Sequence, residues 1–182
     1  MFGPIDHFIF DLSGTLLESS ALAKERVNLS DVCVKIPELL ALLKKNHKEM
    51  FIFTTMGRSR SLEIITDLSW EQEGYFSSDK IRCGDDGHAP KPSGEALKDL
   101  VTCFDLDPNK TAMIGDSTSD ILAAKEAGLR SVAALWDGAS SGRSEKAIFS
   151  DRWSRFDQCD PDLRAISPQS IIEWLELAPD TV

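Results

Sequence analysis

Four groups of polar residues, each placed after an apolar stretch or between prolines, carry side chains suited to phosphoryl transfer. In chain order they are Asp11 with Ser13, Thr54 with Thr55, Lys91, and Asp116 with Asp120. Transfer of a phosphoryl group to a carboxylate needs a nucleophile, donors for the nonbridging oxygens, and a cation that screens one anion from the other. The four groups together supply each of these parts.

The chemistry of the side chains predicts their roles. Asp11 can attack as the nucleophile, Thr54, Thr55 and neighbouring backbone amides can bind phosphoryl oxygens, and Lys91 can neutralise charge. Prolines on both sides of Lys91 restrict its backbone and exclude a helix through it. We therefore expect this lysine to be held in one place.

Asp116 and Asp120 can hold a hard divalent cation, and Mg²⁺ prefers carboxylate and carbonyl oxygens together with water. Each group also has a structural interpretation. Thr54 can be an ordinary strand-end hydroxyl, Lys91 a solvated loop lysine, and Asp116 a helix N-cap with Asp120 in the first turn. The functional hypothesis rests on several strand ends that offer compatible chemistry together.

The elements that must position these groups are predicted from the hydrophobic pattern. Apolar stretches indicate strands over 8–10, 50–53, 112–114 and 131–135, with shorter ones over 81–83 and 163–166. Helical spacing indicates helices over 36–48, 121–127 and 168–177, others starting near Ser59 or Ser61 and at Ser93, and a short one over 145–149. The alternation predicts the α/β class: a doubly wound, mostly parallel sheet of about five strands with helices on both faces.

In order and type the polar groups resemble the motifs of the haloacid dehalogenase superfamily. Asp11-Leu12-Ser13-Gly14-Thr15 is similar to the first motif, 51–55 to the second, Lys91-Pro92 to the third, and 115–120 to the fourth. The similarity extends over roughly 8–177 and is strongest to the phosphoglycolate-phosphatase-like branch. The resemblance implies a Rossmann-like phosphohydrolase that forms an aspartyl-phosphate on Asp11.

The resemblance also implies a metal site and a substrate class. It assigns Mg²⁺ to Asp11, the backbone carbonyl of Ser13 and Asp116, with Asp120 supporting the site, and it implies a small phosphorylated metabolite as substrate. Ser13 departs from the pattern, because phosphatases of the superfamily carry a second Asp there as general acid/base. This departure keeps two alternatives open: a catalytically impaired binding or regulatory relative, and dehalogenase-like chemistry without a metal.

The stretch 16–35 is too short for a full cap, and we expect a loop with one short helix there in place of the cap, within one catalytic domain that spans 1–182. Such a site is open to water and to large substrates unless a second copy of the chain covers it. Arg58 and Arg60 follow the second motif, and we interpret them as a solvated helix start rather than as substrate contacts.

Composition excludes several other classes of protein. The formal net charge is -10, from 30 acidic against 20 basic residues, which disfavours binding to nucleic acid or to anionic membranes. The longest apolar runs are far shorter than a membrane-spanning helix. Four cysteines are scattered without metal-site spacing, which favours reduced thiols and a cytoplasmic location.

Overall fold

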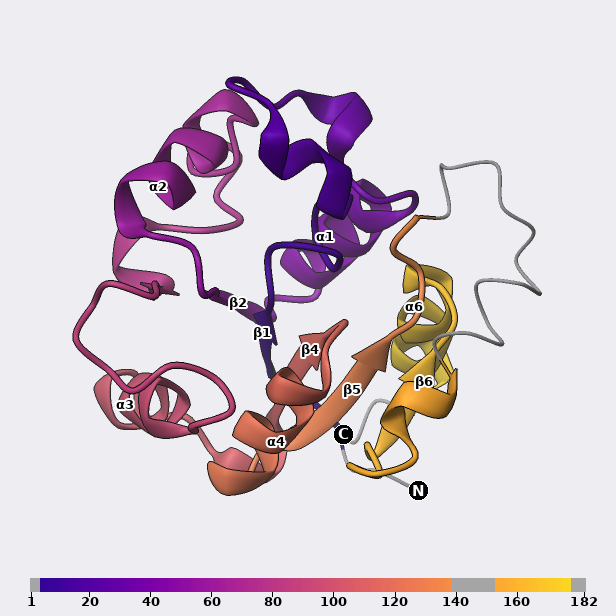
Figure 1. Ribbon diagram of the computed structural model, residues 1–182. Helices are drawn as coiled ribbons and strands as arrows, with labels where there is room; N and C mark the ends of the chain where they lie inside the picture. The colour runs from indigo at the N-terminus through magenta and orange to yellow at the C-terminus, as the bar shows by residue number, and fades with distance from the viewer. Residues whose placement is uncertain (1–3, 139–152, 178–182) are drawn as a thin grey trace.

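Residues 4–138 and 153–177 are described by the computed structural model, and they form a parallel sheet with helices on both faces (Figure 1). The strands lie in the order β3, β2, β1, β4, β5, β6, and every neighbouring pair is parallel. They are β1 (His7–Phe10), β2 (Glu49–Phe53), β3 (Ile81–Arg82), β4 (Thr111–Gly115), β5 (Arg130–Ala134) and β6 (Leu163–Ala165). The predicted fold class is confirmed, and each of the six stretches expected as strands overlaps one, in a sheet slightly larger than the estimate of about five strands.

The α-helices among the described residues divide between the two faces of the sheet. They are α1 (Ile36–Lys45), α2 (Arg58–Asp67), α3 (Glu95–Cys103), α4 (Thr118–Glu126) and α6 (Pro168–Leu177). Apolar residues of α1, α2 and α6 join one core cluster, those of α3 together with Ala123 and Ala124 of α4 join a second, and Ile121 of α4 joins a third, smaller one. Helix α1 ends earlier than the predicted residue 48, because His47 adopts a left-handed conformation with φ 54°. The helix expected over 145–149 lies outside the described residues.

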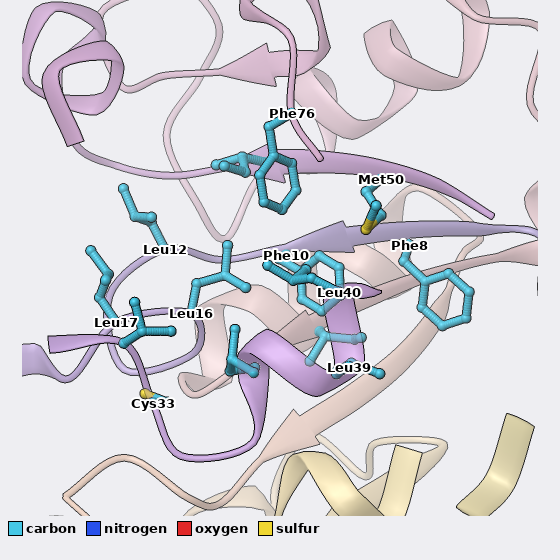
Figure 2. Packing of buried hydrophobic residues seen from close by; sticks show 14 of the residues in the cluster. Phe8, Phe10, Leu12, Leu16, Leu17, Cys33, Leu39, Leu40, Met50 and Phe76 are labelled. Carbon is cyan, nitrogen blue, oxygen red and sulfur yellow. The ribbon is translucent and has the colours of Figure 1, made fainter. Parts of the chain in front are cut away.

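The central strand β1 is buried on both faces, as its apolar run predicts. Phe8 and Phe10 point into the larger cluster, where Figure 2 shows them beside Leu39 and Leu40 of α1. Ile9 points to the opposite face and packs with the cluster under α3 and α4. Full burial of one such side chain stabilises the fold by about 1.5–3 kcal/mol.

The register of the sheet brings the predicted site residues to one level. Phe10 of β1 pairs with Ile52 of β2 and with Ile114 of β4. Because neighbouring strands are parallel and in this register, the residues that follow β1, β2 and β4 emerge side by side at the carboxyl edge of the sheet.

The insert over 16–35 consists of two short 3-10 helices, η1 (Ser19–Ala23) and η2 (Leu29–Asp31), and an isolated antiparallel bridge between Leu17 and Val32. The expected single short helix is therefore wrong in detail. Arg60 on α2 donates to the carbonyls of Lys24 and Glu25, at 2.5 and 2.8 Å. The insert lies beside α2, at the carboxyl edge of the sheet (Figure 1).

The other end of the insert is held by the segment after β5. Asp137 accepts hydrogen bonds from the backbone amide and the hydroxyl of Ser19, both at 2.9 Å, and Glu18 accepts one from the amide of Gly138 at 2.7 Å. The insert is thus fixed to the core from two sides. Within the described residues, every helix is too short or too polar to cross a bilayer.

Candidate active site

Asp11 lies directly after β1, at the centre of the carboxyl edge. Its backbone amide donates to the carbonyl of Ile114 at 2.8 Å, which holds the residue in line with β4. The loop that follows turns back at Gly14, whose φ of 75° favours glycine, and the amide of Gly14 donates to the carbonyl of Leu17. Trp136 donates from Nε1 to the carbonyl of Thr15 at 2.8 Å, so the loop is anchored on its far side too.

Lys91 lies in the segment between β3 and α3, and its side chain extends to Asp11. Its Nζ lies 2.6 Å from Oδ1 of Asp11, 2.6 Å from Oδ1 of Asp120 and 2.8 Å from the carbonyl of Phe53. The contact with Asp120 is an ion pair rather than an aligned hydrogen bond. The Lys91 side chain is only 2% exposed and its ammonium lies 4.5 Å from the centre of the Phe53 ring. The interpretation as a solvated loop lysine is therefore wrong.

Burial controls the charge state of Asp11. Loss of solvent raises the pKa of its carboxyl, Lys91 opposes this rise, and the nearby charge of Asp120 adds to it, so that the pKa reaches about 6. Asp11 is therefore mostly ionised at neutral pH. A carboxyl pKa shifted this far is characteristic of functional sites.

Lys91 stays protonated for the complementary reason. Burial alone lowers the pKa of its ammonium, but the charges of Asp11 and Asp120 outweigh burial and raise the pKa above its ordinary value. The two partners therefore shift in the same direction. Burial dominates for the carboxyl, whereas the two anionic neighbours dominate for the lysine.

Three carboxylates converge beside Lys91. Asp11, Asp116 and Asp120 each offer an oxygen, and these oxygens all lie within 4.8 Å of one another. Gly14 and Gly115 make this packing possible: a Cβ on Gly14 would lie 2.3 Å from Oδ2 of Asp116, and one on Gly115 would lie 2.3 Å from Cγ of Asp120. The glycines thus leave room for a compact, oxygen-rich group.

Helix α4 fixes the orientation of Asp120. The N-cap is Ser117, so the alternative of Asp116 as the N-cap is wrong. The Ser117 amide and hydroxyl both donate to Oδ2 of Asp120, at 3.1 and 2.7 Å, which leaves Oδ1 directed at Lys91. Sequence reasoning overlooked Ser117, although the spacing of Ser117 and Asp120 is that of a capping box.

The remaining predicted residues line the same edge. Thr54 is buried, and its Oγ1 accepts a hydrogen bond from the amide of Met56 at 3.1 Å. Thr55 is exposed, and Gly84 packs against its carbonyl. Ser13 is half-buried two residues after Asp11 and forms an isolated bridge with Leu17. The structure brings the side chains of Asp11, Lys91, Asp116 and Asp120 together, with Thr54 on the adjacent strand end.

Arg58 and Arg60 are not a solvated helix start. Arg58 forms a two-pronged contact with Asp86, through Nε at 2.7 Å and a terminal nitrogen at 2.5 Å, and also donates to the carbonyls of Ser78 and Ile81. Arg60 binds the insert. These partners are distant in sequence, so no local pattern predicts them.

A second acidic group, formed by Cys83, Asp85 and Asp86, lies near the start of α2. Arg58 neutralises Asp86, and hydrogen bonding to that guanidinium lowers the pKa of the Asp86 carboxyl. Asp85 accepts a hydrogen bond from the amide of Arg58 at 2.8 Å and so caps α2. This second group stabilises the turn between β3 and the Lys91 loop.

Comparison with known proteins gives the class to which this fold and site belong. A family model described as haloacid dehalogenase-like hydrolase matches residues 21–134, more than half of the chain. The chain therefore belongs to the haloacid dehalogenase-like hydrolases.

Individual relatives agree with this assignment. The chain is 32% identical over 99 residues to pyrophosphatase PpaX of Bacillus mycoides, covering 54% of the chain and 44% of that relative. It is 31% identical over 115 residues to phosphoglycolate phosphatase 1 of Pseudomonas aeruginosa, covering 63% and 40%. The matches thus span less than half the length of these relatives. A crystal structure of a haloacid dehalogenase-like protein from Agrobacterium tumefaciens shares the fold, with a TM-score of 0.72, 15% identity, and coverage of 94% and 98%.

Proposed function

We propose that the chain is a Mg²⁺-dependent phosphohydrolase that cleaves a small phosphate ester through an aspartyl-phosphate on Asp11. The observation that carries the proposal is the position of Lys91, whose buried ammonium lies 2.6 Å from both Asp11 and Asp120 where the strands end. A cation so placed offsets the charge of a phosphate approaching a carboxylate. The two named relatives, a pyrophosphatase and a phosphoglycolate phosphatase, both act on phosphoryl groups by name.

The donor set suits a hard divalent ion. Three carboxylates with oxygens within 4.8 Å of one another provide the charge and the oxygen ligands that Mg²⁺ takes, with waters completing the shell. Asp11 and Asp116 would hold the ion, together with the carbonyl of Ser13, and Asp120 would support them. When bound, the ion supplies positive charge at the phosphoryl oxygens and helps to orient the ester.

In the proposed reaction, Asp11 would attack through one of its two carboxylate oxygens. Lys91 holds Oδ1, which leaves Oδ2 as the attacking atom. Attack forms a bond between Oδ2 and phosphorus and breaks the bond from phosphorus to the leaving oxygen, which takes up a proton. Water then attacks phosphorus, inorganic phosphate leaves, and the carboxylate is restored. Thr54, buried beside this position, can donate from its hydroxyl to a phosphoryl oxygen.

Ser13 determines which esters react fast. A serine hydroxyl does not protonate a leaving group as a carboxylic acid does, and general acid catalysis contributes roughly 10² to 10⁴ in rate. We infer that the proton comes from water, and that esters with good leaving groups react faster than alkyl esters. An impaired binding protein is the alternative, and it predicts no turnover of either kind.

A screen of the purified protein against alkyl, aryl and acyl phosphates, with millimolar Mg²⁺ or with a chelator, tests the proposal. We expect turnover that requires Mg²⁺ and disappears in Asp11→Asn. The matched control is Asp6→Asn, since Asp6 lies just before the same strand at the opposite edge and pairs with Lys48 and Lys110. Failure to hydrolyse any ester under either condition would rule out the phosphohydrolase and favour the impaired binding protein.

A further inference from the structure

We propose that Trp136 is a positioning residue for the reaction: its indole N–H holds the loop 12–17, directly after the nucleophile, in the conformation that binds the phosphoryl group. This inference rests on the proposed function and adds a residue to it. Trp136 belongs to none of the four predicted motifs, and it follows β5, a strand that carries no predicted site residue.

The loop 12–17 carries backbone donors that its own hydrogen bonds leave available. Three of its amides donate within the loop, to the carbonyls of Leu12 and Leu17. Among the described residues, no backbone carbonyl accepts from the amides of Ser13 and Thr15. Amides of this kind stabilise the charge of a transferring group only when they are held at hydrogen-bond distance from its oxygens. The conformation of the loop therefore decides whether these donors can act.

Apolar contacts fix one side of this loop, and Trp136 fixes the other. Leu12, Leu16 and Leu17 are fully buried and join the larger core cluster (Figure 2). The carbonyl of Thr15 takes its donor from outside the loop, from Nε1 of Trp136 at 2.8 Å. Because Thr15 has no exposed surface, solvent does not replace this donor when it is removed.

The sheet in turn holds Trp136 in place. The amide of Leu135 donates to the carbonyl of Ala165 at 2.9 Å, which continues the pairing of β5 with β6 up to the residue before Trp136. The indole is 3% exposed and packs in the larger core cluster. Because β4 lies between β1 and β5, the indole reaches across the end of β4 to the loop after β1. A donor on a rigid element holds its acceptor more precisely than a donor on a loop.

The two residues after Trp136 hold the next part of the chain through reciprocal contacts. Asp137 accepts from the amide and the hydroxyl of Ser19, and Gly138 donates its amide to Glu18. Both carboxylates are buried, with Glu18 5% and Asp137 8% exposed. Hydrogen bonds to ionised acceptors are stronger than those between neutral groups. These contacts therefore keep Trp136 aligned with the loop that it binds.

Displacement of the loop would disturb the site without unfolding it. Gly14 approaches Asp116 so closely that a Cβ on Gly14 would lie 2.3 Å from Oδ2 of Asp116. Asp11 itself stays tied to β4 through its amide, which donates to the carbonyl of Ile114. The nucleophile would thus stay in place while the amide donors move. Since contacts that strengthen in the transition state determine kcat, we expect loss of the indole N–H to lower kcat more than it raises KM.

Trp136→Phe tests the proposal, because it keeps an aromatic ring in the core and removes the N–H donor. With p-nitrophenyl phosphate at pH 7.5 and saturating Mg²⁺, we expect kcat to fall about 10- to 100-fold, since displacement of positioned groups by about 1 Å can cost about 10² in rate. KM should change by less than about threefold. The matched control is Trp70→Phe: Trp70 is also 3% exposed, follows α2 and packs against Phe76, with ring centres 5.5 Å apart. It should lose similar stability and keep its kcat.

Binding of beryllium fluoride, a phosphoryl mimic, gives a readout that needs no turnover. By calorimetric titration with Mg²⁺ present, we expect Kd to rise about tenfold in Trp136→Phe, the effect of losing about one hydrogen bond, and to stay unchanged in Trp70→Phe. Asp137→Ala, which leaves the indole in place and removes the acceptors for Ser19, should shift kcat and Kd in the same direction by a smaller factor, and it decides the question if Trp136→Phe does not fold.

Equal changes in the Trp136 and Trp70 variants, or an unchanged Kd for beryllium fluoride in both Trp136→Phe and Asp137→Ala, would overturn the role of Trp136 and leave the phosphohydrolase intact. If the original protein turns over no ester, the proposed function fails, and the affinity for beryllium fluoride alone then decides the role of Trp136. Absence of turnover and of beryllium fluoride binding in the original protein would overturn both.

Discussion

Replacement of Lys91 by Met should destabilise the protein strongly and in a way that depends on pH. Methionine keeps much of the apolar volume against the Phe53 ring but leaves Asp11 and Asp120 buried and without their shared cation. Removal of one partner of a buried ion pair costs about 3–5 kcal/mol in free energy of unfolding. For a chain of this size that corresponds to a fall in Tm of roughly 6–20 °C.

The direction of the pH dependence follows from the same contacts. Loss of Lys91 removes the charge that lowers the pKa of Asp11, so that the pKa in the folded variant rises beyond about 6, while in the unfolded chain it stays near 3.8. Between these values the folded state binds more protons than the unfolded state, so the free energy of unfolding falls as pH rises. The deficit of Lys91→Met should therefore be larger at pH 8 than at pH 5.5.

Urea and thermal unfolding with a chelator present, at both pH values, provide the measurement. The matched control is Lys98→Met, which breaks a half-exposed pair with Glu126 between α3 and α4 and should shift the midpoint far less. If the two variants lose equal stability, or if the deficit of Lys91→Met is the same at both pH values, the electrostatic account of this lysine is wrong.

Three further predictions concern the metal site, the protonation of the leaving group and the insert. Millimolar Mg²⁺ should raise Tm by binding the native state, and Asp116→Asn should abolish the shift, as read by calorimetry. Ser13→Asp should raise turnover of alkyl phosphates by about 10² to 10⁴ and barely change aryl phosphates, measured at one pH and one Mg²⁺ concentration. Arg60→Ala should speed amide hydrogen exchange around Lys24 and Glu25 while exchange in β1 stays slow, because those carbonyls lose their donor.

Much of the site was predictable because it depends on local patterns and on parallel register. Apolar runs end at Asp11, Thr54 and Asp116, and a parallel sheet brings such ends to one edge, so these residues converge without any knowledge of distant contacts. The prolines around Lys91 likewise indicated a lysine held in place. The general placement of helices followed from their 3.6-residue spacing.

What the sequence did not reveal depends on partners far apart in the chain. Arg58 binds Asp86 and Arg60 binds carbonyls of the insert, and nothing in the local pattern around either arginine distinguishes such anchors from solvated side chains. The insert lacks a helical period because its conformation is set by hydrogen bonds to α2 and to Asp137. The carbonyl and ring of Phe53 complete the Lys91 site through a contact that no spacing rule predicts.

Chemical trapping of the phosphoenzyme tests the central claim, that Asp11 is the nucleophile. Borohydride added during turnover reduces an aspartyl-phosphate to homoserine, which peptide mass spectrometry locates in the sequence. We predict homoserine at position 11 in the original protein and in Asp6→Asn, dependent on the ester, and none in Asp11→Asn. Rapid turnover of the ester with Asp11 unmodified, or with the reduction at another acid, would contradict the account.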